Sequence, residues 1–267
     1  MPDPSPQPSA LSPRKTIDLN CDMGESYGAW RMGQDAEVMP WITSANIACG
    51  FHAGDFSTMH QTVLLAKAHG VAIGAHVSLP DLQGFGRREL RVTPDEAFAM
   101  TLYQIGALAA FAGAAGMRVA HVKPHGALYN MAAKDAALAG AIARATRAFD
   151  KDLILVGLAG SELPRAGLAA GLRVAHEAFA DRRYEIDGSL TPRSEAGAVI
   201  HDIGAAVAQA VRIATRRNVE ARGGKSIDVR ADTICVHGDR ADAALFARSL
   251  REALAASGVV VAASATD

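Results

Sequence analysis

The sequence predicts an α/β fold, a (β/α)7 TIM-like barrel. Apolar runs of strand length alternate with amphipathic stretches of helical length, which predicts βαβ units and a parallel sheet. Nearly every run ends in polar residues, as expected where strand ends share the mouth of a barrel. An open doubly wound sheet, which concentrates its site at one switch point, is the alternative. The runs begin near Thr16, Ser44, Val71, Arg118, Leu153, Leu172 and Asp232.

Helix boundaries follow from capping residues between these runs. Asp55 and Gly70 bracket a helix over Phe56 to His69. A capping box at Thr93-Pro94-Asp95-Glu96 opens a long Ala-rich helix that ends at Gly116. Further helices are predicted over Asp135 to Phe149, Ser161 to Ala170, Glu195 to Arg217, and from a cap at Asp239 to Ser257.

The chain has 267 residues, of which 49% are hydrophobic, enough for one large core or two small ones. We expect residues 1–14, rich in Pro and Ser, to form a disordered tail. Residues 15–267 show no internal boundary and are predicted to form a single barrel domain. Asn218 to Arg230, with Gly223-Gly224 between short alternating runs, predicts a β-hairpin inserted before the last strand.

Composition argues against several classes of partner. Lys and Arg number 27 against 28 Asp and Glu, and aromatic residues are only 5%, so neither nucleic acid nor an anionic membrane is an expected partner. No run approaches the roughly 20 apolar residues of a membrane span. The three cysteines lack CxxC spacing and lie in apolar runs, which indicates reduced, buried thiols and a cytoplasmic location.

Polar residues repeat at every second position at the ends of three runs, which places each set on one face of a strand. A buried lysine such as Lys123 needs a carboxylate partner or has a depressed pKa. Its candidate partners are Asp18, Asp22 and Glu177. The three sets are Asp18, Asn20 and Asp22; His121, Lys123 and His125; and Cys235, His237 and Asp239.

Other strand ends carry further candidates. Asn46 and His52 follow the second run, and Gly50 and Gly54 beside His52 allow close approach of a ligand. Asp55 there, taken by itself, is better explained as a helix N-cap. His76 and Ser78 end the third run. Glu177 and Asp181 lie on the sixth run, and the loop before Arg87 and Arg88 suits closure over an anionic group.

A metal site is possible but has no local spacing to support it. Asp22, His52, His76, His125 and His237 could meet as ligands for zinc, iron or manganese, but they lie on different strands. Nucleotide-binding signatures are absent. Gly224-Lys225-Ser226 fails as a phosphate-binding loop because Val219 stands where the first glycine is required.

Several long motifs resemble those of the LamB/YcsF family, the A subunits of 5-oxoprolinase, in one register from about Thr16 to Val260. Val77 and Leu79 depart from the family pattern at the third loop. The motifs are Asp18-Leu19-Asn20-Cys21-Asp22-Met23-Gly24-Glu25-Ser26, Ala45-Asn46-Ile47-Ala48-Cys49-Gly50-Phe51-His52-Ala53-Gly54-Asp55, Gly84-Phe85-Gly86-Arg87-Arg88, Val122-Lys123-Pro124-His125-Gly126-Ala127-Leu128-Tyr129-Asn130, Glu177-Ala178-Phe179-Ala180-Asp181-Arg182 and Ile234-Cys235-Val236-His237-Gly238-Asp239.

The resemblance implies a barrel related to sugar deacetylases and ATP-dependent opening of 5-oxoproline (pyroglutamate) to L-glutamate, with ATP and Mg²⁺ and two further subunits (B and C). We therefore predict two groups of site residues. The catalytic group is Asp22, Glu25, His52, His76, Lys123 and His125. The substrate-binding group is Asn20, Asn46, Asp55, Ser78, Arg87, Arg88, Glu177, Asp181 and His237.

Within this hypothesis, Asp22 or Glu25 is the base that activates water, and His52, His76 and His125 carry protons. Lys123 stabilises developing negative charge, and Arg87 or Arg88 holds the substrate carboxylate. Two other functions remain open. One is a stand-alone metal-dependent amidase or deacetylase acting on a small polar substrate. The other is a non-catalytic substrate-binding subunit whose partners hold the chemistry.

Overall fold

The strands form a closed parallel barrel. The computed structural model describes residues 15–238 and 240–264. The order is β10-β1-β2-β3-β4-β5-β6-β9, and β9 also pairs with β1, so seven strands close a ring and the open-sheet alternative is wrong. The barrel strands are β1 (Thr16–Met23), β2 (Ser44–Ala48), β3 (Ala72–Val77), β4 (Val119–Pro124), β5 (Ile154–Leu158), β6 (Arg173–Phe179) and β9 (Thr233–Val236).

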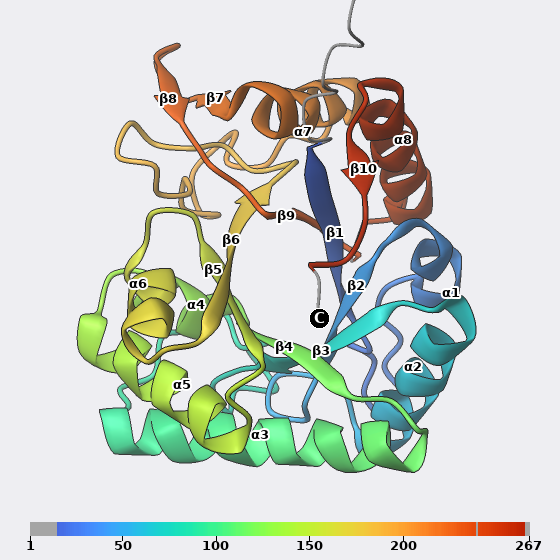
Figure 1. Cartoon of the computed structure of the whole chain (residues 1–267), viewed down its shortest axis with the longest axis vertical. Coiled ribbons are helices and arrows are strands. Elements are labelled where there is room, and N and C mark those ends of the chain that lie inside the picture. The colour runs from blue at the N-terminus through green and yellow to red at the C-terminus, as the bar shows by residue number, and fades with distance from the viewer. Residues whose placement is uncertain (1–14, 239, 265–267) are drawn as a thin grey trace, which may run out of the picture.

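Helices surround the barrel on the outside (Figure 1). The short β10 (Val260–Val261) pairs with the beginning of β1. The short segments α1, η1 and α4 and the strand β10 were not predicted. The helices are α1 (Asp35–Val38), η1 (Met39–Trp41), α2 (Phe56–His69), α3 (Pro94–Ala114), α4 (Gly126–Ala132), α5 (Ala136–Phe149), α6 (Glu162–Ala169), α7 (Ile203–Arg216) and α8 (Ala243–Ala256).

Capping residues fix several boundaries as predicted. The Asp55 carboxylate accepts hydrogen bonds from the backbone N–H groups of Ser57 and Thr58, and Gly70 ends α2 in the left-handed region. The Thr93 side chain and Glu96 form the reciprocal capping box of α3. These contacts satisfy backbone groups that a helix end would otherwise leave unpaired.

Helix α7 corrects one predicted boundary. It begins at Ile203 and not at Glu195, because the Asp202 side chain accepts a hydrogen bond from the Ala205 N–H and caps it there. Gly197 has a φ of 75°, which an α-helix does not allow. Helix α8 has Asp242 at its N-cap. The prediction of a cap at Asp239 lies outside the described residues, as does the prediction of a disordered tail over residues 1–14.

Short alternating runs form the hairpin expected before the last barrel strand. Strands β7 (Asn218–Glu220) and β8 (Ser226–Asp228) pair antiparallel, with Val219 opposite Ile227. The assignment of residues 15–267 to a single domain stays a prediction.

Helix α3 has 21 residues and is long and apolar enough, by length and composition alone, to cross a membrane. Our expectation that no run approaches such a length did not anticipate this helix, because Thr101 and Gln104 interrupt its apolar residues. It packs along α5 and β3 on the outside of the barrel. One such helix is weak evidence for a membrane span, since the core helices of soluble proteins also pass this test.

Side chains along β1 divide between the two faces of the barrel wall. Leu19, Cys21 and Met23 are buried in the apolar layer, while Asp18 and Asn20 alternate with them. The three cysteines of the chain are free and buried, as predicted. Parallel register then aligns the polar residues of neighbouring strands, for example His76 with Lys123. The barrel interior is therefore polar, and its polar groups are stacked in layers.

Candidate active site

A pocket of about 880 Å³ opens where the carboxyl ends of the barrel strands meet. Five of the six predicted catalytic residues line it, and the sixth, His52, lies directly behind two of them. Strand ends from far apart in the chain thus converge, as the alternating polar pattern predicted. The five are Asp22, Glu25, His76, Lys123 and His125.

Lys123 is the electrostatic centre of the pocket floor. Its side chain is 3% exposed, and Nζ lies 2.9 Å from Asp22 Oδ1 and 2.9 Å from Glu177 Oε1. It also donates to Asn20 Oδ1 at 3.1 Å and lies 3.2 Å from Cys235 Sγ. Burial lowers the pKa of Lys123, but the neighbouring Asp22, Cys235 and Glu177 outweigh it and raise that pKa well above its usual value. Lys123 is therefore a permanent cation that holds two carboxylates.

Asp22 is held as a carboxylate between Lys123 on one side and His76 on the other. Oδ1 contacts Lys123 and accepts a hydrogen bond from Asn46 Nδ2 at 2.9 Å, and Oδ2 lies 3.2 Å from His76 Nε2. Burial raises the pKa of Asp22, but the charges of His76 and Lys123 outweigh it and hold that pKa well below 3.8. A carboxylate with so low a pKa accepts a proton poorly and balances positive charge well.

A layer of amides lies beneath this ion pair. Asn46 Nδ2 donates to Asn20 Oδ1 at 2.7 Å, and Asn20 Nδ2 donates to Glu177 Oε1 at 3.0 Å. His121 Nε2 lies 2.7 Å from Asn46 Oδ1, which can only accept, so Nε2 carries the proton. Burial lowers the pKa of His121 to about 3. Asn20, Asn46 and Glu177, predicted to bind substrate, are instead buried supports of the ion pair.

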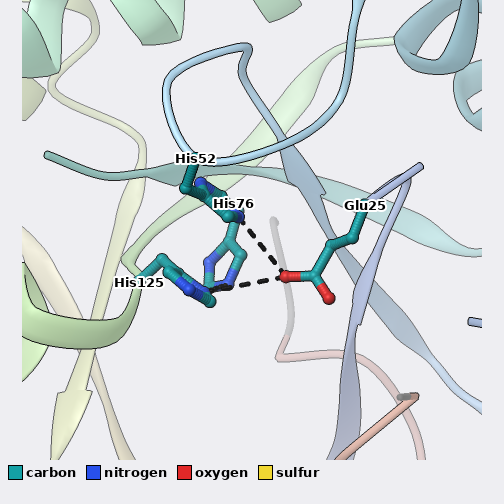
Figure 2. Close-up of side chains that lie close together, drawn as sticks. All are labelled: Glu25, His52, His76 and His125. Atoms are coloured by element: carbon teal, nitrogen blue, oxygen red, sulfur yellow. Dashed lines mark hydrogen bonds and ion pairs between the residues drawn. The ribbon is translucent and has the colours of Figure 1, made fainter. Parts of the chain in front are cut away.

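Four side chains meet beside Asp22, and we call Glu25, His52, His76 and His125 the histidine cluster. One ligand atom from each lies within 4.8 Å of all the others. Figure 2 shows the three imidazoles and the carboxylate turned toward one another. His52 stacks on His125 with ring centroids 3.9 Å apart, and its Nε2 lies 3.3 Å from Glu25 Oε1. Burial, first of all, lowers the pKa of both His52 and His125 well below the usual value.

A further histidine, His237, lines the pocket outside the histidine cluster. His237 Nδ1 lies 2.8 Å from Asp181 Oδ1, and Arg193 Nη2 lies 2.7 Å from His237 Nε2. Since a guanidinium only donates, His237 Nε2 accepts a hydrogen bond from Arg193, and the protonated Nδ1 donates one to Asp181. His237 is thereby kept apart from the histidine cluster, so the predicted convergence of all five metal-ligand candidates is wrong for His237.

Two predicted substrate-binding residues lie away from the pocket, and a third is covered. The Asp55 carboxylate caps α2 and also accepts a hydrogen bond from the Gly28 N–H. Arg88, whose side chain is 63% exposed, forms an ion pair with Asp81. Ser78 is fully buried beneath Gly86. Local capping and loop-closing contacts engage the first two, and tertiary packing covers the third. Arg87, by contrast, lines the pocket as predicted.

The sequence matches the model of the LamB/YcsF family over residues 17–267. The chain belongs to the LamB/YcsF family. It is 62% identical over 249 residues to the 5-oxoprolinase A subunit of Methylococcus capsulatus, covering 93% of this chain and 96% of that one. It is 58% identical over 248 residues to the 5-oxoprolinase A subunit of Bordetella parapertussis, covering 93% and 98%.

Among solved structures, the lactam utilization protein of Thermus thermophilus is 50% identical, with a TM-score of 0.89 over 93% of this chain and all of that one. A deacetylase solved with its substrate gives a TM-score of 0.49 at 12% identity, too weak a likeness to support an argument. The kinship with sugar deacetylases that the family resemblance implied therefore stays a prediction.

The LamB/YcsF pocket contains residues that our sequence interpretation missed. Arg182, Arg193 and Tyr129 line it, and the buried Nε of Arg182 has no hydrogen-bond partner. Burial and the charges of Arg193 and Arg87 outweigh Asp181 and lower the pKa of Arg182 to about 10. Arg182 directly follows Asp181 in a motif we had quoted, and that position was the available signal. Arg193 had no signal, because a long irregular segment carries it.

Proposed function

We infer that this chain is the A subunit of a 5-oxoprolinase, which opens 5-oxoproline to L-glutamate at the expense of ATP together with subunits B and C. One observation supports this most directly. The pocket combines a buried carboxylate–lysine pair with three lining arginines, in a chain that matches relatives named as 5-oxoprolinase A subunits over almost its whole length.

The reaction needs activation of a poor electrophile. A lactam carbonyl resists attack by water, and phosphorylation of its oxygen by ATP makes the carbon electrophilic. Water then adds to that carbon, the ring C–N bond breaks, and the nitrogen takes a proton. The resulting acyl phosphate loses phosphate to a second water, which leaves glutamate, ADP and phosphate. A site for this sequence must hold anions, activate water and deliver protons.

Three arginines that line the pocket suit the anionic groups. They are Arg87, Arg182 and Arg193, and the unpartnered Nε–H of Arg182 is a buried donor available to an oxyanion. We assign the carboxylate of 5-oxoproline, or the phosphoryl group on its activated carbonyl, to these arginines because planar guanidinium groups bind such oxyanions in a fixed geometry. This assignment replaces Arg88 with Arg182 in the predicted substrate-binding group.

The carboxylate and histidines that line the pocket suit the activation of water. Glu25, His76 and His125 line it together and present a carboxylate and two imidazoles to one place. Ionised Asp22 balances positive charge that collects on His76. The Lys123 ammonium group is already engaged by Asp22, Glu177 and Asn20. We therefore assign it the role of positioning these side chains and keeping Asp22 ionised, and not of contacting the substrate.

The nucleotide and Mg²⁺ are assigned to the assembled complex. The sequence carries no phosphate-binding loop or dinucleotide fingerprint, so the partner subunits are expected to supply the ATP-binding device. The wide pocket of this chain would then receive the substrate, and phosphoryl transfer would take place where the chains meet.

Reconstitution tests the proposal. This chain, subunits B and C, 5-oxoproline and ATP are combined, and glutamate and phosphate are measured while each component is omitted in turn. We expect one glutamate and one phosphate for each ATP consumed, and no product when any component is absent. Amide hydrolysis without ATP would instead identify a stand-alone amidase. Undiminished activity without this chain would contradict the proposal.

Variants of this chain then separate catalysis from binding. Arg182→Gln should raise the KM for 5-oxoproline by about 10- to 100-fold. Arg88→Gln is the matched control, because the Arg88 side chain lies away from the pocket.

Glu25→Gln should lower kcat. A non-catalytic binding subunit would give Glu25→Gln a raised KM with an unchanged kcat.

A further inference from the structure

We propose that Glu25, His52, His76 and His125 form a binding site for one divalent transition-metal ion, of the zinc, iron(II) or manganese class. The site is argued from the arrangement of hydrogen-bond donors and acceptors within the histidine cluster. It stands independently of the substrate, because none of the observations below depends on which molecule the pocket accepts.

The proton count between two of the imidazoles is the first observation. His76 Nδ1 lies 2.9 Å from the backbone oxygen of Lys123, and His125 Nε2 lies 2.9 Å from that of Phe85. A carbonyl only accepts, so both of these nitrogens carry protons. In the neutral rings, His76 Nε2 and His125 Nδ1 then bear only lone pairs, yet they face one another at 2.9 Å. Two lone pairs at that distance repel unless a positive charge lies with them.

The other two ligand atoms complete a shell around the same point. Glu25 Oε1 lies 3.3 Å from His52 Nε2 and 3.7 Å from His125 Nδ1. In a tetrahedral zinc site with bonds of about 2.0–2.1 Å, neighbouring ligand atoms lie about 3.3–3.4 Å apart. The distances in the cluster bracket that value. Figure 2 shows the four side chains directed at one small space.

The surroundings of the cluster match those of a metal site. The two backbone carbonyls fix the tautomers of His76 and His125 and raise the basicity of the facing nitrogens, as outer partners of metal-bound histidines commonly do. His52 and His76 are 1% and 0% exposed. Burial of an imidazole without a proton keeps its nitrogen available as a ligand.

A tight loop encloses the cluster from above. Gly86 has a φ of 65°, and a Cβ there would lie 2.8 Å from His52 Cβ and 2.9 Å from His125 Cδ2. The same loop carries Phe85, which has a φ of 55° and directs its carbonyl to His125. The loop conformation thus both closes over the imidazoles and supplies the carbonyl that sets the tautomer of one of them.

A proton shared between His76 and His125 is the competing explanation for their close approach. Asp22 Oδ2, 3.2 Å from His76 Nε2, would then balance its charge. That arrangement needs only two of the histidines. It gives no role to His52, whose Nε2 is also directed at Glu25 Oε1. A metal ion uses all three imidazoles.

Metal titration of the full chain tests the site. Protein purified without metal-affinity steps is stripped with a chelator, and Zn²⁺ and Co²⁺ are titrated by calorimetry. Metal content is measured by elemental analysis, and the visible absorption of bound Co²⁺ reports its geometry. We expect one ion for each chain and an intense four- or five-coordinate Co²⁺ spectrum. Absence of stoichiometric binding of Zn²⁺, Co²⁺, Fe²⁺ and Mn²⁺ would overturn the proposal.

Variants locate the ion. His125→Gln and Glu25→Gln should each weaken Zn²⁺ binding by at least about 10- to 100-fold, the loss that even an outer partner of a metal site typically causes. His237→Gln removes a pocket histidine outside the cluster and should bind as tightly as the wild type. If the ion binds equally well to all three variants, it lies elsewhere and the proposal fails.

Two further measurements cover variants that do not fold. Circular dichroism of each stripped variant establishes whether it folds. X-ray absorption of the Zn²⁺-loaded wild type counts imidazole ligands without any substitution, and three are expected. Fewer than two imidazoles, or a proton detected by nitrogen NMR between His76 and His125 in protein saturated with Zn²⁺, would assign the close approach to proton sharing instead.

Discussion

Asp18 and Asp22 lie four residues apart on the same face of β1, yet the two carboxyls have opposite electrostatic surroundings. Within the described part of the chain, the Asp18 carboxyl accepts hydrogen bonds from three hydroxyls, those of Thr43, Ser44 and Thr233, at 2.6 to 2.8 Å. Burial raises its pKa, and these hydrogen bonds offset only part of that rise. Asp22 has a lysine and a histidine beside it, and its pKa is lowered.

The difference shows how a barrel separates a supporting layer from a reactive one. Hydroxyls satisfy an acid in either protonation state, because they donate and accept. Cations satisfy only the ionised acid. The lower layer around Asp18 therefore tolerates a neutral group, whereas the upper layer around Asp22 depends on charge. Four predictions test this contrast.

The largest effect is expected from Lys123→Met. The substitution leaves Asp22 and Glu177 as buried charges without their cation, so unfolding free energy should fall by about 3–5 kcal/mol in denaturant titrations. Adding Asp22→Asn to Lys123→Met should restore part of the loss, because one uncompensated charge is removed. If the double variant is less stable than the single one, charge is not what the upper layer depends on.

The pH dependence of stability should have opposite signs at the two aspartates. The folded-state pKa of Asp22 is below 3.8, so its ionised form contributes stability that is present above about pH 3.8 and is lost as the pH falls toward the folded value. The folded-state pKa of Asp18 is above 3.8, so its contribution is present below about pH 3.8 and is lost as the pH rises through the folded value.

Asp22→Asn and Asp18→Asn should therefore diverge in urea unfolding measured from about pH 3 to about pH 7. Relative to the wild type, Asp22→Asn should become less stable as the pH rises, and Asp18→Asn more stable. The two Asn substitutions are matched in size and chemistry. Parallel curves for the two variants would remove the distinction between the layers.

The loop above the upper layer gives a smaller effect. Gly86→Ala places a methyl group, at a φ of 65°, in contact with Ser78 Oγ, its nearest neighbour, and 2.8 Å from His52 Cβ. Gly70 has the same φ with no atom near its missing Cβ, so Gly70→Ala is the matched control for backbone strain alone. Gly86→Ala should lose about 1–3 kcal/mol more than Gly70→Ala in thermal or denaturant unfolding. Equal losses would show that the loop does not pack tightly against Ser78 and the histidine cluster.

The smallest effect is expected in the lower layer from Ser44→Ala. It removes one of three hydroxyls from Asp18 and should cost about 1 kcal/mol of unfolding free energy, because the other two remain. It should leave the kinetics of the reconstituted enzyme unchanged, since Ser44 lies below the pocket. Reduced turnover in Ser44→Ala would show that the layer around Asp18 also contributes to catalysis.

Sequence alone predicted much of the barrel and part of its site. Alternation along β1 and β4 placed Asp18, Asn20 and Asp22, and also Lys123 and His125, on interior faces because a strand has a period of two. Local signals also placed the cap at Asp55 and the capping box at Thr93. The start of α7 was predicted too early, because the periodic pattern from Glu195 outweighed the turn at Gly197 and the cap at Asp202.

Only the tertiary structure decided which of the candidates meet. Lys123 pairs with Asp22 and Glu177 across more than 50 intervening residues on each side, and no local spacing encodes such a distance. The structure separated His237 from the other histidines and engaged Arg88 with Asp81. The chain thus determined by itself which side chains face inward, since that depends on strand period. Barrel closure and register determined which of them touch.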